Sequence, residues 1–292
     1  RYAGLYGPAV EASPDASHSS AEWTNKDWRP RPNAVFLDDW LARCCELIDK
    51  YRPQVVWFDW WIEQAVFEPY LQKFAAYYYN RGLEWGKGVL IQHKHESFAR
   101  GTALYDIERG KLNEIREDYW QADTAVSYKS WCYVEDDEFK TATTIVHDLV
   151  DIVSKNGNLL LNVGPKPDGT IPDEAAKLLH GLGAWLDVNG EAIYGTRHWH
   201  TFGEGDTTVG EGHMRERDDE PFSATDIRFT TKGNNLYAIC LGWPGETAVI
   251  ESLRSASTVP AESIEHIHML GSDEPLSWSQ RGDGLHIDTP SE

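Results

Sequence analysis

An aspartate set among tryptophans is the strongest chemical signal in the sequence. Asp59 directly follows the apolar run Val55–Phe58, and Trp57 and Trp60 lie close to it in the chain. A carboxylate is costly to hold among apolar rings unless it has a partner or a chemical task. At the end of a buried strand it can serve as a nucleophile in glycosyl transfer, or it can cap the loop that follows. The aromatic neighbours favour the nucleophile.

The elements that must position Asp59 follow an alternation of strands and helices up to about residue 200. Short apolar runs typical of buried parallel strands alternate with segments in which apolar residues recur at helical spacing. The expected strands are residues 2–6, 55–58, 88–91, 124–126 and 159–162, and the expected helices are 34–50, 66–80, 143–154 and 173–188. In barrels built from such units, catalytic groups lie at the carboxyl ends of strands, where Asp59 stands.

Beyond about residue 200 the apolar pattern changes to the period of two that is typical of strands. Alternating segments at 226–230, 236–240, 247–250 and 284–287 are separated by turns that contain Gly, Asn and Pro. We therefore expect two domains, a βα domain over residues 1–200 and a small antiparallel β-sandwich over residues 201–292. Because few residues follow the last segment, we expect the sandwich to be cut short.

The βα region holds fewer strands than a closed barrel, which is built from about eight. One explanation is a (β/α)8-like TIM barrel that lacks its first strands, and the alternative is an open, doubly wound sheet. A doubly wound nucleotide-binding sheet carries a Gly-rich phosphate loop after its first strand, and the sequence has none there. The sequence therefore favours an incomplete barrel of the α/β class.

The composition excludes several classes of partner. A formal net charge of −20 repels nucleic acid and anionic membranes. No apolar run approaches the roughly eighteen residues of a membrane-spanning helix. The four cysteines lack the spacing of a zinc site, so we expect no metal or other cofactor. Thirteen Trp and thirteen Tyr are many for a core of this size, so either rings are available to stack on sugars or the core is rich in Trp.

Several ordered motifs recur in a known family of glycosidases. They are Trp57–Asp59, Tyr105–Gly110, Ser130–Tyr133, Asp151–Asn162 and Asn189–Gly195. Together they resemble glycoside hydrolase family 29, the α-L-fucosidases. The resemblance implies a retaining exo-α-L-fucosidase in which Asp59 attacks the sugar and forms a covalent fucosyl-enzyme intermediate. A second carboxylic acid, roughly 5 to 5.5 Å from the nucleophile in such enzymes, protonates the leaving oxygen and then deprotonates water.

Glu108 is our candidate for this acid/base, because it lies at about the separation from the nucleophile at which related enzymes carry theirs. We expect it in a loop with Arg109, after the second βα unit. The position varies within the family, so Glu114 and Glu117 remain alternatives. The structural alternative makes Glu108 an ion-pair partner of Arg109 or of a loop backbone.

Fucose carries a methyl group at C6, so its site should combine apolar area with hydrogen bonds to hydroxyls. Trp57 and Trp131 suit the apolar part of such a site. The resemblance implies that Trp57 lines the sugar pocket and that Tyr6 contacts the sugar. Lys94 stands where relatives often carry an arginine, and it can donate to a hydroxyl without the fixed fork of a guanidinium. The histidines on either side of it are expected to be hydrogen-bonding loop residues and not metal ligands. Asn162 is expected to orient a neighbouring loop.

Early barrel strands with the family's sugar-binding His-His and His-Trp pairs do not occur in the sequence. We therefore expect either that the sequence is a fragment or that the pocket is completed by a homo-oligomer or a complementing N-terminal chain. Fucosylated glycans are the expected ligand. Two other functions stay open, a non-catalytic fucose-binding or assembly subunit and a barrel glycosidase for another sugar. Glycan-degrading enzymes are often exported, which favours a secreted or periplasmic location.

Overall fold

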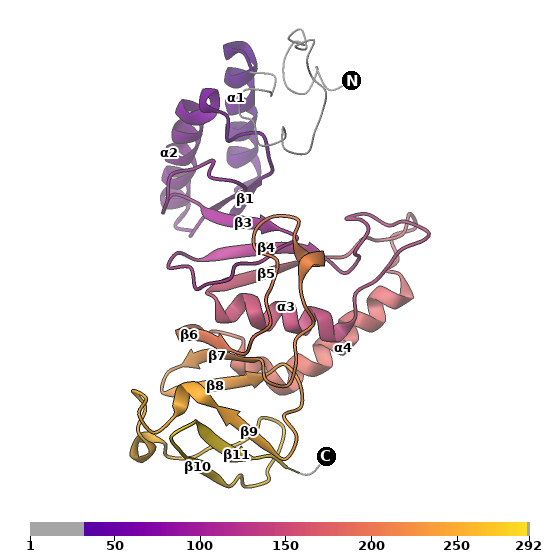
Figure 1. Cartoon of the computed structure of the whole chain (residues 1–292). Coiled ribbons are helices and arrows are strands. Elements are labelled where there is room, and N and C mark those ends of the chain that lie inside the picture. The colour runs from indigo at the N-terminus through magenta and orange to yellow at the C-terminus, as the bar shows by residue number, and fades with distance from the viewer. Residues whose placement is uncertain (1–31, 291–292) are drawn as a thin grey trace, which may run out of the picture. The chain divides into compact units, whose positions relative to one another are not determined.

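The computed structural model describes residues 32–290, so Tyr6 and the expected opening strand at 2–6 lie outside the described residues. The chain forms two compact units, residues 1–106 and 107–292, and the boundary falls inside the strand β3. Figure 1 shows the elements coloured in chain order from indigo to yellow. None of the helices formed by residues 32–290 has the length and apolar character needed to cross a membrane.

Within residues 1–106, parallel strands are combined with two described helices. The elements are α1 (Ala34–Tyr51), β1 (Val55–Phe58), a 3-10 turn (Ala65–Phe67), α2 (Glu68–Trp85), β2 (Leu90–His93) and β3 (Leu104–Glu108). β1 pairs with β2, with Val55 opposite Leu90, and β2 pairs with β3, with Gln92 opposite Leu104. Neighbours in the chain are therefore neighbours in the sheet, as they are in a (β/α) barrel.

Local chemistry explains where α1 begins and ends. The side chain of Asn33 accepts a hydrogen bond from the Phe36 N–H at 2.9 Å, as an N-cap does. The helix stops at Arg52, whose backbone is left-handed (φ 48°) and whose N–H donates to the Ile48 carbonyl. The helix predicted at 34–50 is confirmed to within a residue.

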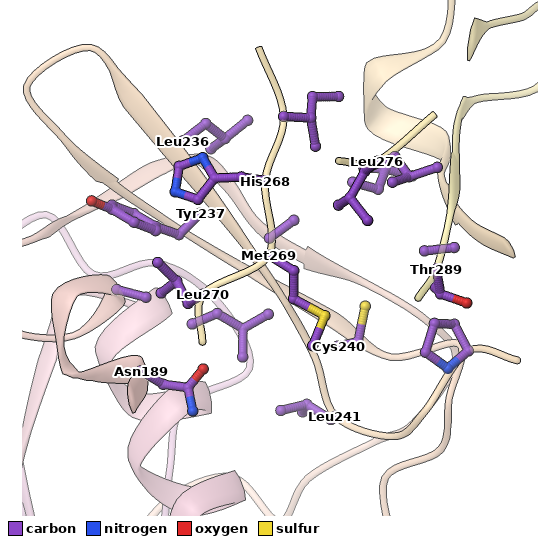
Figure 2. A pocket seen from close by; sticks show the side chains of 18 of the residues that line it. Asn189, Leu236, Tyr237, Cys240, Leu241, His268, Met269, Leu270, Leu276 and Thr289 are labelled. Carbon is purple, nitrogen blue, oxygen red and sulfur yellow. The ribbon is translucent and has the colours of Figure 1, made fainter. Parts of the chain in front are cut away.

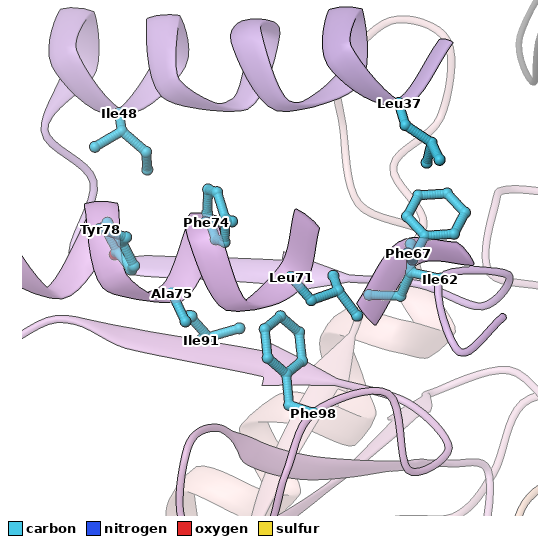
Figure 3. Close-up of a cluster of buried hydrophobic side chains, with 10 residues drawn as sticks. All are labelled: Leu37, Ile48, Ile62, Phe67, Leu71, Phe74, Ala75, Tyr78, Ile91 and Phe98. Carbon is cyan, nitrogen blue, oxygen red and sulfur yellow. The ribbon is translucent and has the colours of Figure 1, made fainter. Parts of the chain in front are cut away.

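A cluster of apolar side chains lies between these helices and the strands (Figure 3). Leu37 and Ile48 reach it from α1, Phe74 and Tyr78 from α2, and Ile91 from β2. Burying a large apolar side chain contributes roughly 1.5–3 kcal/mol, so this cluster is the main stabilising feature of the unit.

β1 contributes alternate residues to this core. Val56 and Phe58 pack against the cluster, and the Phe58 ring centroid lies 5.1 Å from that of Phe74. Because successive strand residues point to opposite faces, Trp57 and then Asp59 are directed away from the helices. Val56 and Phe58 thus anchor the strand, and the alternation along it directs Trp57 and Asp59 to the opposite face.

The sequence predicted no strand at residues 104–108 and placed Glu108 in a loop, whereas the structure has β3 there. Leu104–Glu108 contains two acids, and acidic residues are poor strand formers. Other bounds also differ from the prediction, as two examples show. β2 begins at Leu90 and not at residue 88, and α2 continues to Trp85, beyond its predicted end at residue 80.

Residues 107–292 combine a parallel strand pair with antiparallel sheets. The elements are β4 (Trp120–Ala125), α3 (Ala142–Ser154), β5 (Gly157–Asn162), α4 (Asp173–Asn189), β6 (Arg197–Glu204), β7 (Ile227–Lys232), β8 (Asn235–Cys240), β9 (Thr247–Ile250), β10 (Trp278–Gln280) and β11 (Leu285–Asp288). β4 and β5 are parallel, and a Cβ at Gly157 would meet the Trp120 ring at 2.6 Å. The strand predicted at 124–126 covers only the end of β4, because Gln121 and Asp123 interrupt its apolar pattern.

Two antiparallel sheets, β6–β7–β8 and β9–β11–β10, share one apolar core. Phe229 enters it from β7, Ile250 from β9 and Leu285 from β11. β7, β8, β9 and β11 confirm the alternating segments predicted for this region. β6 and β10 were not predicted, because their many polar residues give no clear alternation.

A buried ion cluster attaches β7 to α3. Asp151 of α3 accepts hydrogen bonds from Arg228 Nε and Lys155 Nζ, each at 2.7 Å, and the three side chains are at most 3% exposed. Burial alone would raise the pKa of the Asp151 carboxyl, but Lys155 and Arg228 hold it below its usual value. The folded state therefore keeps this carboxylate ionised.

We expect Asp151→Asn to destabilise the protein by about 3–5 kcal/mol at neutral pH, because two buried cations lose their counter-charge. A depressed pKa stabilises the fold above the ordinary value of about 3.9, and this contribution is lost as the pH falls through the folded-state pKa. The free energies of unfolding of the wild type and Asp151→Asn should therefore approach each other below about pH 4. Urea titrations at a series of pH values measure both.

The control is Asp218→Asn, which breaks an exposed pair with Arg215 and should cost at most about 1 kcal/mol. A stability difference between the wild type and Asp151→Asn that does not change with pH would contradict the assignment of an ionised Asp151.

Candidate active site

Asp59 lies at the carboxyl end of β1, as predicted, and it is exposed. Trp60 and Trp61 belong to the turn that follows, and Trp61 has a left-handed backbone (φ 86°). A positive φ is an outlier for a bulky residue and persists only where the surroundings impose it. The carboxylate is thus placed by a strand end and a constrained turn.

A buried carboxylate on β3 fixes the ring of Trp57. The indole Nε1–H of Trp57 donates to Asp106 Oδ2 at 2.7 Å. The Lys94 ammonium lies 3.5 Å from the same oxygen and 5.1 Å from the centre of the Trp57 ring. Asp106 and Lys94 are fully buried, whereas Trp57 is 40% exposed. The polar edge of the indole is fixed while part of its apolar surface stays accessible.

Lys94 directly follows β2, and its contact with a sugar hydroxyl stays a prediction. The structure adds a second role, because a fully buried ammonium needs a counter-charge and Asp106 supplies one. His93 is the last residue of β2 and not a loop residue, and its ring lies 5.5 Å from that of Phe98. Among residues 32–290, no group of three or more His, Cys, Asp or Glu side chains is arranged to hold a metal ion.

Asp106 is a residue that sequence reasoning missed, because it assigned a role only to Glu108 in this motif. The available signal was the alternation of Asp106, Ile107 and Glu108, which is that of a strand. A polar residue inside a buried strand needs a hydrogen-bonding partner. A strand assignment would therefore have marked Asp106 as a residue with a specific contact.

Glu108 is the last residue of β3, and the predicted loop position is wrong. The carboxyl end of a parallel strand is where barrel enzymes carry catalytic groups. The Glu108 N–H donates to His213 Nδ1 at 3.0 Å, and its carbonyl accepts from the Met214 N–H at 2.7 Å. His213 and Met214 belong to the connection between β6 and β7, which sequence reasoning did not link to Glu108.

The two alternative acids lie elsewhere in residues 107–292. Glu117 is exposed, and its carbonyl accepts a hydrogen bond at 3.1 Å from Asn156, which precedes β5. That contact places Glu117 near the amino ends of β4 and β5, away from the strand ends that carry chemistry in barrels. Glu114 is exposed and lies earlier in the same connection. This geometry favours Glu108 over both.

Arg109 forms its ion pair with Glu216, at 2.6 Å, which does not support Glu108 as its partner. The Arg109 guanidinium carbon lies 4.3 Å from the ring centre of Trp131, which is half-buried. Asn162 Nδ2 donates to the Trp131 carbonyl at 2.7 Å. The predicted role of Asn162 in orienting a neighbouring loop is thus confirmed, and the loop is the one that carries Trp131.

The carboxylate of Glu216 contacts other donors besides Arg109. Its carboxylate accepts hydrogen bonds from Lys140 Nζ at 2.7 Å and from Thr124 Oγ1 at 2.5 Å, and its side chain is 8% exposed. Burial alone would raise the pKa of Glu216, but Lys140, Thr124 and Arg109 hold it below its usual value. Glu216 is therefore an ionised structural carboxylate and not a proton donor.

A cavity of about 1160 Å³ lies elsewhere in residues 107–292 (Figure 2). Leu236, Leu270 and Leu276 line it, with Met269 and His268 from the segment before β10. Its described lining contains a single carboxylate, which belongs to Glu265. The cavity therefore does not offer the pair of carboxyl groups that glycosyl transfer requires.

Comparison with known proteins gives matches along most of the chain. A family model described as alpha-L-fucosidase matches residues 13–191, and one described as alpha-L-fucosidase C-terminal domain matches residues 220–292. Human tissue alpha-L-fucosidase is 30% identical over 261 residues, which cover 84% of this chain and 49% of that protein. An alpha-L-fucosidase of Branchiostoma floridae is 28% identical over 283 residues, which cover 92% of this chain and 55% of that protein.

Solved structures agree with these matches. The crystal structure of Thermotoga maritima alpha-fucosidase in complex with fucose has a TM-score of 0.65 and 33% identity, covering 88% of this chain and 53% of that one. The chain thus spans about half the length of the curated relatives it matches.

The ion pair between Lys94 and Asp106 gives a test of the site's construction. We expect Asp106→Ala to destabilise the protein by about 3–5 kcal/mol, because it leaves the Lys94 ammonium buried without this counter-charge. The double variant Lys94→Met/Asp106→Leu replaces the pair by apolar side chains and should recover most of that loss. Urea unfolding followed by circular dichroism measures both.

Asp39→Ala, which breaks an exposed pair with Arg43, is the control and should cost at most about 1 kcal/mol. If the double variant is no more stable than Asp106→Ala, the uncompensated charge is not the source of the loss.

Proposed function

Because this chain belongs to the alpha-L-fucosidase family, we propose that its protein hydrolyses terminal α-L-fucose from oligosaccharides or glycoconjugates. The family match over residues 13–191 supports this proposal, since it includes Asp59 and Glu108. The similarity to proteins named alpha-L-fucosidase supports it as well. Fucosylated glycans are then the ligand, and a retaining reaction is the proposed mechanism.

The observation that carries the proposal is a fixed, partly exposed indole beside a strand-end carboxylate. Trp57 is held by Asp106 and Lys94, and Asp59 follows it by two residues at the end of β1. An apolar ring suits the C6 methyl and the C–H face of fucose. The neighbouring carboxylate suits attack on the anomeric carbon.

In the first step, an Asp59 carboxylate oxygen attacks C1 of fucose while the bond from C1 to the leaving oxygen breaks. Protonated Glu108 gives its proton to that oxygen, and the aglycone leaves as an alcohol. The product is a fucosyl ester of Asp59 with inverted configuration at C1.

In the second step, the Glu108 carboxylate takes a proton from water, and the water oxygen attacks C1. The ester bond breaks and Asp59 returns to its carboxylate form. Two inversions give net retention of configuration at C1. Atoms and charges balance with water as the co-reactant, and Glu108 ends the cycle protonated.

The remaining predicted site residues have proposed roles in holding the sugar. We assign Trp57 and Trp131 to its apolar surface. An ammonium has three donors, so the pairing of Lys94 with Asp106 is compatible with a bond from Lys94 to a hydroxyl. Tyr6 keeps its predicted contact as a proposal, since it lies outside the described residues.

Replacing the nucleophile should abolish turnover. We expect Asp59→Ala to lower kcat on 4-nitrophenyl α-L-fucoside by on the order of 10⁴-fold or more, because no group remains to form the ester. Asp187→Ala, at an exposed position on α4, is the matched control and should keep the wild-type kcat. Circular dichroism checks that both variants are folded.

The outcomes separate the competing functions. An active Asp59→Ala excludes Asp59 as nucleophile. A wild-type protein that binds fucose but does not hydrolyse the fucoside is a binding subunit. Preferred hydrolysis of another nitrophenyl glycoside identifies a glycosidase for a different sugar.

Azide tests the role of Glu108. We expect Glu108→Ala to slow hydrolysis of the ester by about 10²–10⁴-fold, because water loses its general base. Azide needs no such base, so it should restore turnover and give the α-fucosyl azide by net retention. In Asp59→Ala, azide should instead attack the substrate directly and give the β-azide. Proton NMR of the products distinguishes the two.

Glu114→Ala and Glu117→Ala are the controls and should hydrolyse the fucoside at the wild-type rate. Azide rescue with retention in either control variant, and not in Glu108→Ala, would move the acid/base to that residue.

A further inference from the structure

The connection between β6 and β7 (residues 205–226, the β6–β7 loop) runs beside the chain at the end of β3. Figure 1 shows it in orange, leaving the antiparallel sheet and passing α3 toward β4 and β5. Its N–H groups donate to successive carbonyls, from Met214 to Glu108 at 2.7 Å and from Arg215 to Arg109 at 2.9 Å. The loop therefore contacts the residue we propose as acid/base.

This close approach requires glycine. The Gly212 N–H donates to the Lys111 carbonyl at 2.9 Å, and a Cβ at Gly110 would overlap the carbonyl oxygen of Gly212. Glycine at position 110 lets the two backbones lie in contact along residues 108–111.

One side chain of the loop holds the Glu108 backbone directly. The Glu108 N–H donates to Nδ1 of His213 at 3.0 Å. An imidazole nitrogen that accepts an N–H carries its lone pair there, so the proton of the neutral ring is on Nε2. The β6–β7 loop thus binds both the N–H and the carbonyl of Glu108.

Buried charges anchor the loop after His213. Glu216 pairs with Arg109 at 2.6 Å, and Asp219 pairs with Lys111. All four of these side chains are at most 17% exposed. Moving the loop away would leave buried cations without these partners, so its position beside Glu108 is strongly fixed.

We propose that the β6–β7 loop sets the position of the Glu108 carboxyl and that His213 is a positioning residue for proton transfer to the leaving group. The inference rests on the proposed function, in which Glu108 is the general acid. Glu108 ends its strand, so its backbone contacts decide where its side chain begins. A residue 105 positions later in the chain thereby contributes to the geometry of the acid.

Two fucosides that differ in their leaving group distinguish the positioning of the acid by His213 from a general structural role of this residue. 2-Chloro-4-nitrophenolate departs without a proton, whereas the methanol of methyl α-L-fucoside needs one from Glu108. The ratio kcat/KM reports the first step, in which that bond breaks. A misplaced acid lowers kcat/KM mainly on the methyl fucoside, whereas damage to the whole site lowers it on both substrates.

We expect His213→Ala in the intact protein to lower kcat/KM on methyl α-L-fucoside by roughly 10- to 100-fold, and on the aryl fucoside by less than about threefold. His213→Asn should restore most of the loss, because its side-chain oxygen accepts the same N–H. Asp206→Ala, at an exposed position in the same loop, is the control and should leave both values unchanged. Equal losses on both substrates, no loss on either, or failure of His213→Asn to restore the rate would overturn the proposal.

Hydrogen exchange at the Glu108 amide gives a readout that does not depend on turnover. Loss of the bond to His213 should speed exchange about tenfold or more in His213→Ala, with protection regained in His213→Asn. If the wild type hydrolyses no fucoside, the proposed function fails and this measurement still decides on the contact. Unchanged exchange in His213→Ala overturns the positioning role, and faster exchange in His213→Ala alone supports the contact between His213 and the Glu108 N–H on which that role rests.

Discussion

The buried carboxylate of Glu216 is the contact that fixes the segments around Glu108. It forms ion pairs with Arg109, which follows β3, and with Lys140, which precedes α3. Glu216 itself belongs to the loop between β6 and β7. A buried ion left without its partner costs roughly 3–5 kcal/mol, so none of these segments moves alone. Glu108 directly precedes Arg109, so the same contacts restrict the position of its backbone. The proposed acid is thus placed jointly by the end of a parallel strand and by a loop of the antiparallel part.

A second buried carboxylate, that of Asp106, fixes neighbouring side chains within residues 32–106. Asp106 accepts the Trp57 N–H at 2.7 Å and balances the Lys94 ammonium at 3.5 Å. The Trp57 ring, which we propose contacts the sugar, is therefore held by charge and hydrogen bonding at its polar edge, while Phe58 beside it is held by packing. A rigid aromatic surface binds with little loss of side-chain freedom, which suits the proposed binding of a small sugar.

The sequence predicted the elements whose apolar patterns are strong and missed those that tertiary contacts hold. The helix at Ala34–Tyr51 and the strand at Val55–Phe58 were found because their apolar residues recur at regular spacing. β3 was missed because Asp106 and Glu108 resemble loop residues until the contacts of Asp106 with Trp57 and Lys94, and of the Glu108 backbone with His213, are known. His213 gave no signal at all, since its contact with Glu108 spans 105 positions and no local pattern marks it.

Covalent labelling with a 2-deoxy-2-fluoro-fucosyl fluoride tests directly whether Asp59 is the nucleophile. Fluorine at C2 slows both steps by destabilising positive charge at C1, and fluoride leaves without acid, so the fucosyl ester accumulates. Peptide mass spectrometry then locates the modified residue. We expect one label per chain on Asp59 and none in Asp59→Ala. A label on another carboxylate, or turnover of the unlabelled fucoside with no trapped ester, would contradict Asp59 as the nucleophile of a retaining reaction.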